Sequence, residues 1–128
     1  MKWTRSGHWL FCYGTLQQNC VYARAAGVTP TPLIRARLSN WRLVAIPGAN
    51  YPGAIPAKRN VRIDGGLRLV RTKEEWAALD AYEGPTYQRL ACTVEIASGR
   101  VSAFVYRYLA QLKPMRLSTT ACISYSKD

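Results

Sequence analysis

Residues 61–84 read VRIDGGLRLVRTKEEWAALDAYEG and change from a strand pattern to a helix pattern within one stretch. From Val61 to Leu69, apolar side chains stand at odd positions and charged ones at even positions, which is typical of a half-buried strand. The alternation keeps its phase through Gly65-Gly66. This favours one continuous strand with glycines where another backbone or a bend comes close. A hairpin with a two-residue glycine turn is the alternative.

The second half of this stretch predicts a helix over Lys73–Glu83. Thr72 is suited to accept a hydrogen bond from an exposed amide, and Glu75 three residues later is placed to reach back, as in a capping box. Trp76 and Leu79 then recur at helical spacing. Gly84 followed by proline is a typical helix end. One helix is thus set among strands.

The rest of the chain reads mainly as strands and turns. We expect a strand at His8–Tyr13, a turn or short helix at Asn19–Ala26, one long or bent strand at Leu33–Ile46, a loop at Pro47–Pro56, and strands at 87–97 and 100–109 joined at Ser98-Gly99. With one helix and several antiparallel strands, the fold class is α+β, and a small closed or partly closed β-barrel with the helix packed outside suits it.

The length fits one domain over residues 1–128, with a core at about 8–110 and a weakly patterned tail at 111–128. No linker or repeat divides the chain. The longest apolar run near the start, Trp9 to Tyr13, is too short for a membrane span or a signal peptide. We therefore expect a cytoplasmic protein without a membrane partner.

The chain is basic, with 18 Lys and Arg against 7 Asp and Glu and a formal net charge of +11. Residues 1–63 hold nine of the basic residues and no acidic one. Such a charge makes nucleic acids and anionic small molecules possible partners. The basic residues never form a run longer than Lys58-Arg59, so arginines on solvated strand faces are an equally good interpretation.

The sequence argues against several kinds of site. The single histidine, His8, is an ordinary strand-start residue rather than the base of a nucleophilic triad. The four cysteines contain no C-x-x-C pair, so we expect free thiols and no zinc site. Gly65-Gly66 lacks the spacing of a phosphate-binding loop.

Two places remain where chemistry is plausible. Tyr13-Gly14-Thr15-Leu16 ends the first strand, and its glycine lets the backbone turn and leave amides free for a carboxylate or an oxyanion, although the spacing alone favours an ordinary strand exit. Glu83 lies in the last turn of its helix beside Tyr82. The helix dipole and the aromatic neighbour would raise its pKa toward the range of a general base, whereas a solvent-facing glutamate is the alternative. Asp80 is the reserve candidate.

Taken together, these motifs resemble the gamma-glutamylcyclotransferase-like family. The resemblance covers roughly residues 9–108. It is carried by the segments Phe11–Leu16, Trp41–Leu43, Tyr51–Gly53, Val61–Val70, Leu79–Gly84 with Tyr87 and Arg89 behind it, and Val105-Tyr106. The pairing of YGTL with LDxYEG about seventy residues later is the specific part.

The resemblance implies a small mixed barrel that holds a cavity. It implies that the backbone of Tyr13, Gly14, Thr15 and Leu16 grips a γ-glutamyl group, that Glu83 is the catalytic acid and base, and that Tyr87, and also Tyr51, lines the cavity. The implied reaction is attack of the substrate's own α-amine on its γ-carbonyl, which gives 5-oxoproline and a released amine. It implies no metal and no other cofactor. The alternatives are a non-catalytic module that binds a small molecule in the same cavity and a basic nucleic-acid-binding domain.

Overall fold

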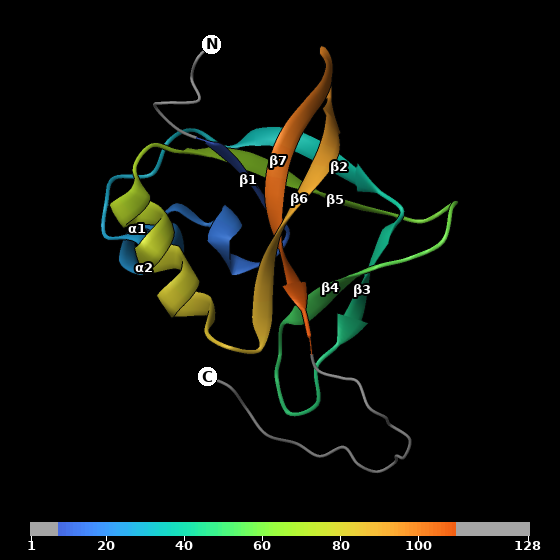
Figure 1. Cartoon of the computed structure of the whole chain (residues 1–128), viewed down its shortest axis with the longest axis horizontal. Coiled ribbons are helices and arrows are strands. Elements are labelled where there is room, and N and C mark those ends of the chain that lie inside the picture. The colour runs from blue at the N-terminus through green and yellow to red at the C-terminus, as the bar shows by residue number, and fades with distance from the viewer. Residues whose placement is uncertain (1–7, 110–128) are drawn as a thin grey trace.

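The computed structural model describes residues 8–109 of the 128-residue chain (Figure 1). The expectations for the tail at 111–128 lie outside the described residues. Within 8–109, neither helix is long and apolar enough to cross a membrane.

The strands form a closed mixed barrel with a two-strand extension. The barrel strands, in spatial order, are β1 (His8–Cys12), β5 (Arg62–Val70), β2 (Ile34–Ser39), β6 (Tyr87–Ile96) and β7 (Gly99–Tyr108). A parallel pairing of β1 with β7, at Leu10 and Phe104, closes the ring, and the other neighbours in it are antiparallel. The extension is β4 (Pro52–Pro56), which pairs parallel with β7, and β3 (Trp41–Ala45), which pairs antiparallel with β4. The expected α+β barrel is confirmed.

Two α-helices, α1 (Asn19–Ala26) and α2 (Lys73–Glu83), lie together on one side of the barrel, as Figure 1 shows. A short 3₁₀ turn, η2 (Thr15–Gln17), connects β1 to α1. The cap of α2 is the predicted one, because Thr72 Oγ1 accepts from the amide of Glu75 at 3.0 Å. The Glu75 carboxylate reaches back as well, but it accepts from the amide of Arg71.

The two faces of the barrel strands supply two hydrophobic cores. Leu10 packs with Tyr22, Leu79 and other residues under the helices, while its neighbour Phe11 packs with Leu67 and Val105 in a cluster of strand residues. Consecutive strand residues point to opposite faces, so adjacent positions of β1 serve both cores. The helix layer and the barrel are thereby joined along β1.

The expectation of one strand over Leu33–Ile46 was wrong. The chain turns at Asn40, which adopts a left-handed backbone with φ of 67°. Asparagine tolerates this conformation better than most residues. The turn separates β2, which pairs with β5 and β6, from β3, which pairs with β4.

The expectation of a loop throughout Pro47–Pro56 was also wrong. Residues Pro52–Pro56 form β4, and the prolines begin and end the strand rather than interrupt it. A Cβ on Gly53 would lie 2.6 Å from Cβ and Cγ of Tyr108, so only glycine allows β4 to lie this close to β7.

The Gly65-Gly66 pair lies inside β5, so the prediction of one continuous strand is confirmed and the hairpin alternative is excluded. A Cβ on Gly65 would collide with the carbonyl oxygen of Cys12 on β1. Another backbone therefore comes close at this point, as the strand pattern predicted.

Candidate active site

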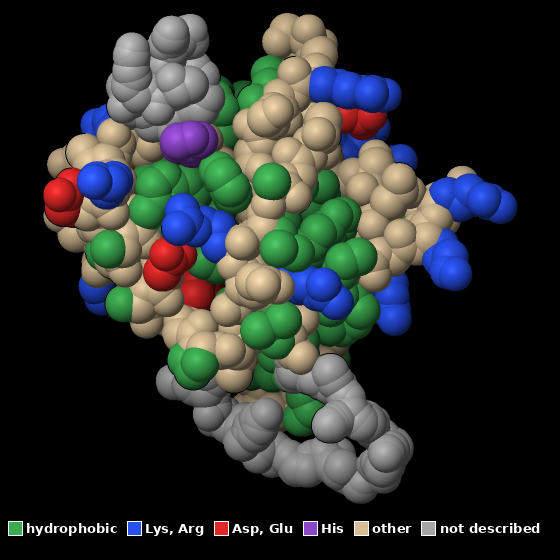
Figure 2. Space-filling model, in the orientation of Figure 1, with side chains coloured by type: hydrophobic (Ala, Val, Ile, Leu, Met, Phe, Trp, Pro, Cys, Tyr) green, Lys and Arg blue, Asp and Glu red, His purple; other side chains and the backbone are tan. Residues whose placement is uncertain are grey.

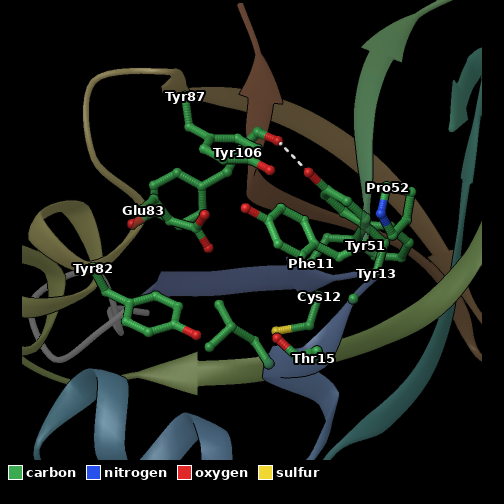
Figure 3. A pocket seen from close by; sticks show the side chains of 12 residues that line it. Phe11, Cys12, Tyr13, Thr15, Tyr51, Pro52, Tyr82, Glu83, Tyr87 and Tyr106 are labelled. Atoms are coloured by element: carbon green, nitrogen blue, oxygen red, sulfur yellow. Dashed lines mark hydrogen bonds between the residues drawn. The ribbon is translucent and has the colours of Figure 1, made fainter. Parts of the chain in front are cut away.

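A cavity of about 380 Å³ opens where the first strand, the end of α2 and the extension meet (Figure 3). The structure brings all six predicted site residues to its wall. The lining consists of Phe11 to Leu16 from β1 and η2, Tyr51 and Pro52 before and at the start of β4, Tyr82 and Glu83 from α2, and Tyr87 and Tyr106 from β6 and β7.

The Tyr13–Leu16 loop, which runs into the first two residues of η2, forms one wall of the cavity. Gly14 lies between strand and turn with φ of −126° and ψ of −137°, and its carbonyl accepts from the amide of Gln17 at 3.1 Å. Leu16 is buried in the core under the helices, whereas Thr15, which also lines the cavity, is exposed. The loop is therefore anchored at Leu16 and accessible at Thr15.

The side chain of Tyr13 joins three strands across the cavity floor. Its hydroxyl donates to the carbonyl oxygen of Tyr106 at 3.0 Å, the dashed line in Figure 3, and accepts from the amide of Ala54 at 3.2 Å. Burial raises the pKa of Tyr13 well above its ordinary value, and the nearby Tyr87 and Glu83 raise it further. The phenol therefore stays protonated and acts as a structural donor.

Glu83 is the last residue of α2, and Figure 3 shows its side chain extending from the helix end toward the cavity. The side chain is half-buried. Its negative charge acts on the phenols of the wall: added to the larger effect of burial, it raises the pKa of Tyr13 and of Tyr87. Among the described lining residues, Glu83 is the only carboxylate, and it is placed beside the predicted substrate loop.

Tyrosines make up much of the remaining wall. Tyr87 contacts Tyr108 with ring centroids 5.8 Å apart, and burial is the main cause of its raised pKa. Tyr51 lines the cavity as the resemblance implied, and Tyr82, which is 47% exposed, lines it as well. Such a wall suits the methylene groups of a small ligand and offers few ionised groups to it.

The reserve candidate Asp80 lies outside the cavity lining. Its Oδ1 accepts from the hydroxyl of Tyr106 at 2.7 Å, and its Oδ2 accepts from Nη2 of Arg89 at 3.1 Å. Both carboxylate oxygens therefore already hold α2 against β6 and β7. The structure gives Asp80 a supporting place and leaves Glu83 as the carboxylate of the cavity.

A family model described as gamma-glutamyl cyclotransferase, AIG2-like, matches residues 10–125 of the sequence. The chain belongs to this family. The match ends at residue 125, whereas the motifs that carried the resemblance end near residue 108. A search of curated protein sequences finds no relative of this member of the cyclotransferase family.

Solved structures share the fold of this family member at low sequence identity. It is similar to an Arabidopsis thaliana protein known from a solution structure, with 22% identity, 85% of this chain and 73% of that chain covered, and a TM-score of 0.73. An AIG2-like protein from Mus musculus gives 21% identity, coverage of 84% and 81%, and a TM-score of 0.71. A gamma-glutamyl cyclotransferase gives 14% identity, coverage of 80% and 66%, and a TM-score of 0.68.

Sequence reasoning missed several cavity residues of this cyclotransferase-family chain. Phe11 and Cys12 precede the YGTL motif directly, and Tyr106 carries the closing-strand match, so the family motifs contained these positions without revealing their role. Burial raises the pKa of the Cys12 thiol from 9.0 to about 12. The thiol is therefore a neutral part of the wall and no nucleophile at ordinary pH.

Proposed function

We propose that this protein is a γ-glutamyl cyclotransferase that releases 5-oxoproline and an amine from a γ-glutamyl amine or amino acid. The observation that carries the proposal is that Glu83 and the Tyr13–Leu16 loop, two motifs about seventy residues apart, line one cavity. Family membership supports the same reaction class.

The reaction needs little more than positioning and proton transfer. The substrate's α-amine attacks its γ-carbonyl carbon, the ring C–N bond forms, and the bond from that carbon to the leaving nitrogen breaks. Closure of a five-membered ring is intramolecular, so a cavity that holds the chain folded supplies much of the rate. The walls formed by Phe11, Tyr87 and Tyr106 pack against the methylene groups of the substrate.

Glu83 moves the proton in this proposal. Its carboxylate takes a proton from the attacking amine and gives it to the nitrogen that leaves, so the enzyme ends as it began. The backbone of the Tyr13–Leu16 loop binds the γ-glutamyl group and the charge that develops on the carbonyl oxygen. The Tyr13 hydroxyl, bonded to the backbone on both sides, takes no part in proton transfer.

The test is incubation with a panel of γ-glutamyl amines and amino acids, assayed for 5-oxoproline and for the free amine in equal amounts. We expect Glu83→Gln to lower kcat by about 100-fold or more, since a positioned acid–base group contributes that much. Glu74→Gln makes the same change on the exposed first turn of α2 and keeps full activity. Absence of 5-oxoproline with every compound, or full activity in Glu83→Gln, overturns the proposal; a ligand that binds without turnover points to the non-catalytic module.

A second candidate is nucleic-acid binding, which one observation favours. Arg42, Lys58 and Arg59 line a shallow hollow of about 530 Å³ whose described lining contains no acidic residue. Figure 2 shows Lys and Arg side chains projecting from the side of the molecule that carries β2 and β3. Part of the nearby charge is neutralised, because Arg37 and Arg62 lie 3.5 and 3.9 Å from Asp64.

Binding to an arbitrary RNA or DNA oligonucleotide, measured at rising salt, tests this candidate. Phosphate binding predicts an affinity that falls steeply with salt. Replacement of Arg42, Lys58 and Arg59 by Gln would reduce the slope of log affinity against log salt concentration by about three, because three phosphate contacts are lost. Absence of binding at low salt eliminates nucleic-acid binding and has no bearing on the cyclotransferase proposal.

A further inference from the structure

The side chain of Arg68 is completely buried, which is rare for an arginine. The alternation along Val61–Leu69 placed it on a charged strand face, and its neighbours in that pattern, Arg62 and Asp64, are exposed. Arg68 instead extends from β5 under η2 and α1. A buried guanidinium keeps its charge, and its burial is costly unless every donor finds a partner.

Every acceptor that Arg68 contacts is neutral. Its Nε donates to the carbonyl of Leu16 at 2.9 Å, and its Nη2 donates to the carbonyl of Gln17 at 2.7 Å and to Oδ1 of Asn19 at 2.9 Å. Its Nη1 donates to the carbonyl of Thr31 at 2.6 Å. The positive charge is therefore hydrogen-bonded but has no ion-pair partner within residues 8–109.

The ring of Tyr22 covers the guanidinium, whose Cζ lies 4.9 Å from the ring centroid. A cation–π contact of this kind holds a cation without cancelling its charge. The same guanidinium binds two successive carbonyls at the end of the loop that lines the cavity. Because peptide groups are planar, holding these carbonyls also fixes the peptide planes of Leu16 and Gln17.

The charge of Arg68 reaches the cavity wall. It lowers the pKa of the Cys12 thiol, against the larger raising effect of burial. Cys12 and Leu16 both line the cavity, so the guanidinium lies directly behind that wall. Glu83, the last residue of α2, supplies negative charge and raises the pKa of the same thiol.

We infer that Arg68 is a positioning residue of the cavity, which sets the Tyr13–Leu16 loop from behind and makes the cavity selective for ligands that carry a carboxylate. The identity of that ligand as a γ-glutamyl compound rests on the proposed function. The positioning of the loop and the preference for a carboxylate do not depend on it. A buried charge acts through the low-dielectric interior, where solvent screens it less than it screens surface arginines.

A reporter thiol in the cavity tests the electrostatic effect without reference to catalysis. Thr15→Cys, with Cys20 and Cys122 changed to Ser, is alkylated with iodoacetate, which is anionic, and with iodoacetamide, which is neutral. We expect Arg68→Gln to lower the iodoacetate-to-iodoacetamide rate ratio by about threefold or more and Arg68→Lys to keep most of it. Arg100→Gln removes the same charge from an exposed position and leaves the ratio unchanged. An unchanged ratio in Arg68→Gln overturns the inference.

Two measurements keep the inference testable if Arg68→Gln fails to fold. Arg68→Lys retains the charge but cannot hold four acceptors at once, so hydrogen exchange at the amides of residues 15–18 should rise while exchange in β6 and β7 stays slow. In the chain with native Arg68, the rate ratio at Thr15→Cys should exceed that at Ser102→Cys, an exposed position on β7. Equal ratios, or unchanged exchange, overturn the corresponding part of the inference.

Ligand binding separates this inference from the proposed function. Calorimetry compares 5-oxoproline, which carries a carboxylate, with its neutral amide, in the unaltered chain and in Arg68→Gln. We expect the preference for the acid to fall by the same factor as the alkylation ratio, and an equal loss for acid and amide would reduce Arg68 to a structural role. If neither compound binds the unaltered chain, the alkylation ratio still decides the role of Arg68, and the 5-oxoproline assay still decides the cyclotransferase proposal.

Discussion

The hydroxyl of Tyr22 donates a 2.6 Å hydrogen bond to Oε2 of Glu75, and both side chains are buried. Tyr22 comes from α1 and Glu75 from the first turn of α2, so this bond joins the two helices. The second oxygen of Glu75 accepts from the amide of Arg71 at 3.1 Å. The buried carboxylate is therefore satisfied on both oxygens, once by the backbone and once by α1.

Tyr22→Phe should lower the free energy of unfolding by about 1–3 kcal/mol, because it leaves one oxygen of a buried carboxylate without its donor. Urea denaturation with an unchanged m-value would measure this loss. Tyr82→Phe deletes a hydroxyl from a half-exposed tyrosine and should change stability by less than about 0.5 kcal/mol. Equal stability of the two variants would show that the bond contributes nothing.

Tyr13→Phe should weaken the junction of β1, β4 and β7 at the cavity floor. The change leaves the amide of Ala54 and the carbonyl of Tyr106 without a shared partner, at a cost of about 1–3 kcal/mol. In the proposed mechanism Tyr13 transfers no proton, so the pH profile of kcat should keep its shape even where its height falls. A profile whose pKa values move would instead give the phenol a part in the chemistry.

Asp80→Asn should affect stability more than catalysis. The carboxylate lies outside the cavity lining, where it binds Arg89 and the hydroxyl of Tyr106, and its ion pair with Arg89 is partly exposed, so we expect a loss of about 1 kcal/mol. 5-Oxoproline formation should fall by no more than about fivefold, compared with the 100-fold loss expected for Glu83→Gln. The reverse ranking would exchange the roles assigned to the two carboxylates.

Stability should fall in alkaline solution through the buried thiol of Cys12. Burial raises its pKa from 9.0 to about 12, so between these values the unfolded chain releases a proton that the folded chain keeps. The contribution of the neutral thiol is complete below about pH 9 and is lost as pH rises toward 12. Cys12→Ala should flatten the decline of unfolding free energy over this interval relative to the unaltered chain. Cys20→Ala, at an exposed position, should leave the slope unchanged.

Local signals in the sequence were sufficient for the helix Lys73–Glu83 and for the strands that became β1, β5, β6 and β7. Capping, alternation and a turn before Gly99 are properties of neighbouring residues, so they can be read without knowing the fold. The same rules failed at Asn40 and at Pro52–Pro56. There the deciding contact is remote, because β4 exists through its pairing with β3 and with β7.

The candidate site divides in the same way. The motifs named Tyr13 to Leu16, Glu83 and Tyr87, and the structure places all of them on one cavity. No local pattern indicated that Asp80 would be bound by Tyr106 and Arg89 while Glu83, three residues later, would reach the cavity. Residues three apart lie on nearly the same face of a helix, so the helical period alone does not separate them, and the packing of α2 against the barrel decides which carboxylate reaches the cavity.

The sequence by itself determined the class of fold, the strand and helix segments that carry local signals, the excess of positive charge and the family motifs. The tertiary structure alone decided what each charge does. Arg62 and Arg68 look alike in the alternation of one strand, yet Arg62 is exposed and Arg68 is buried behind the Tyr13–Leu16 loop. The physical reason is that burial depends on what packs over a strand face. Only the folded chain brings η2, α1 and the carbonyls of Leu16, Gln17 and Thr31 over Arg68.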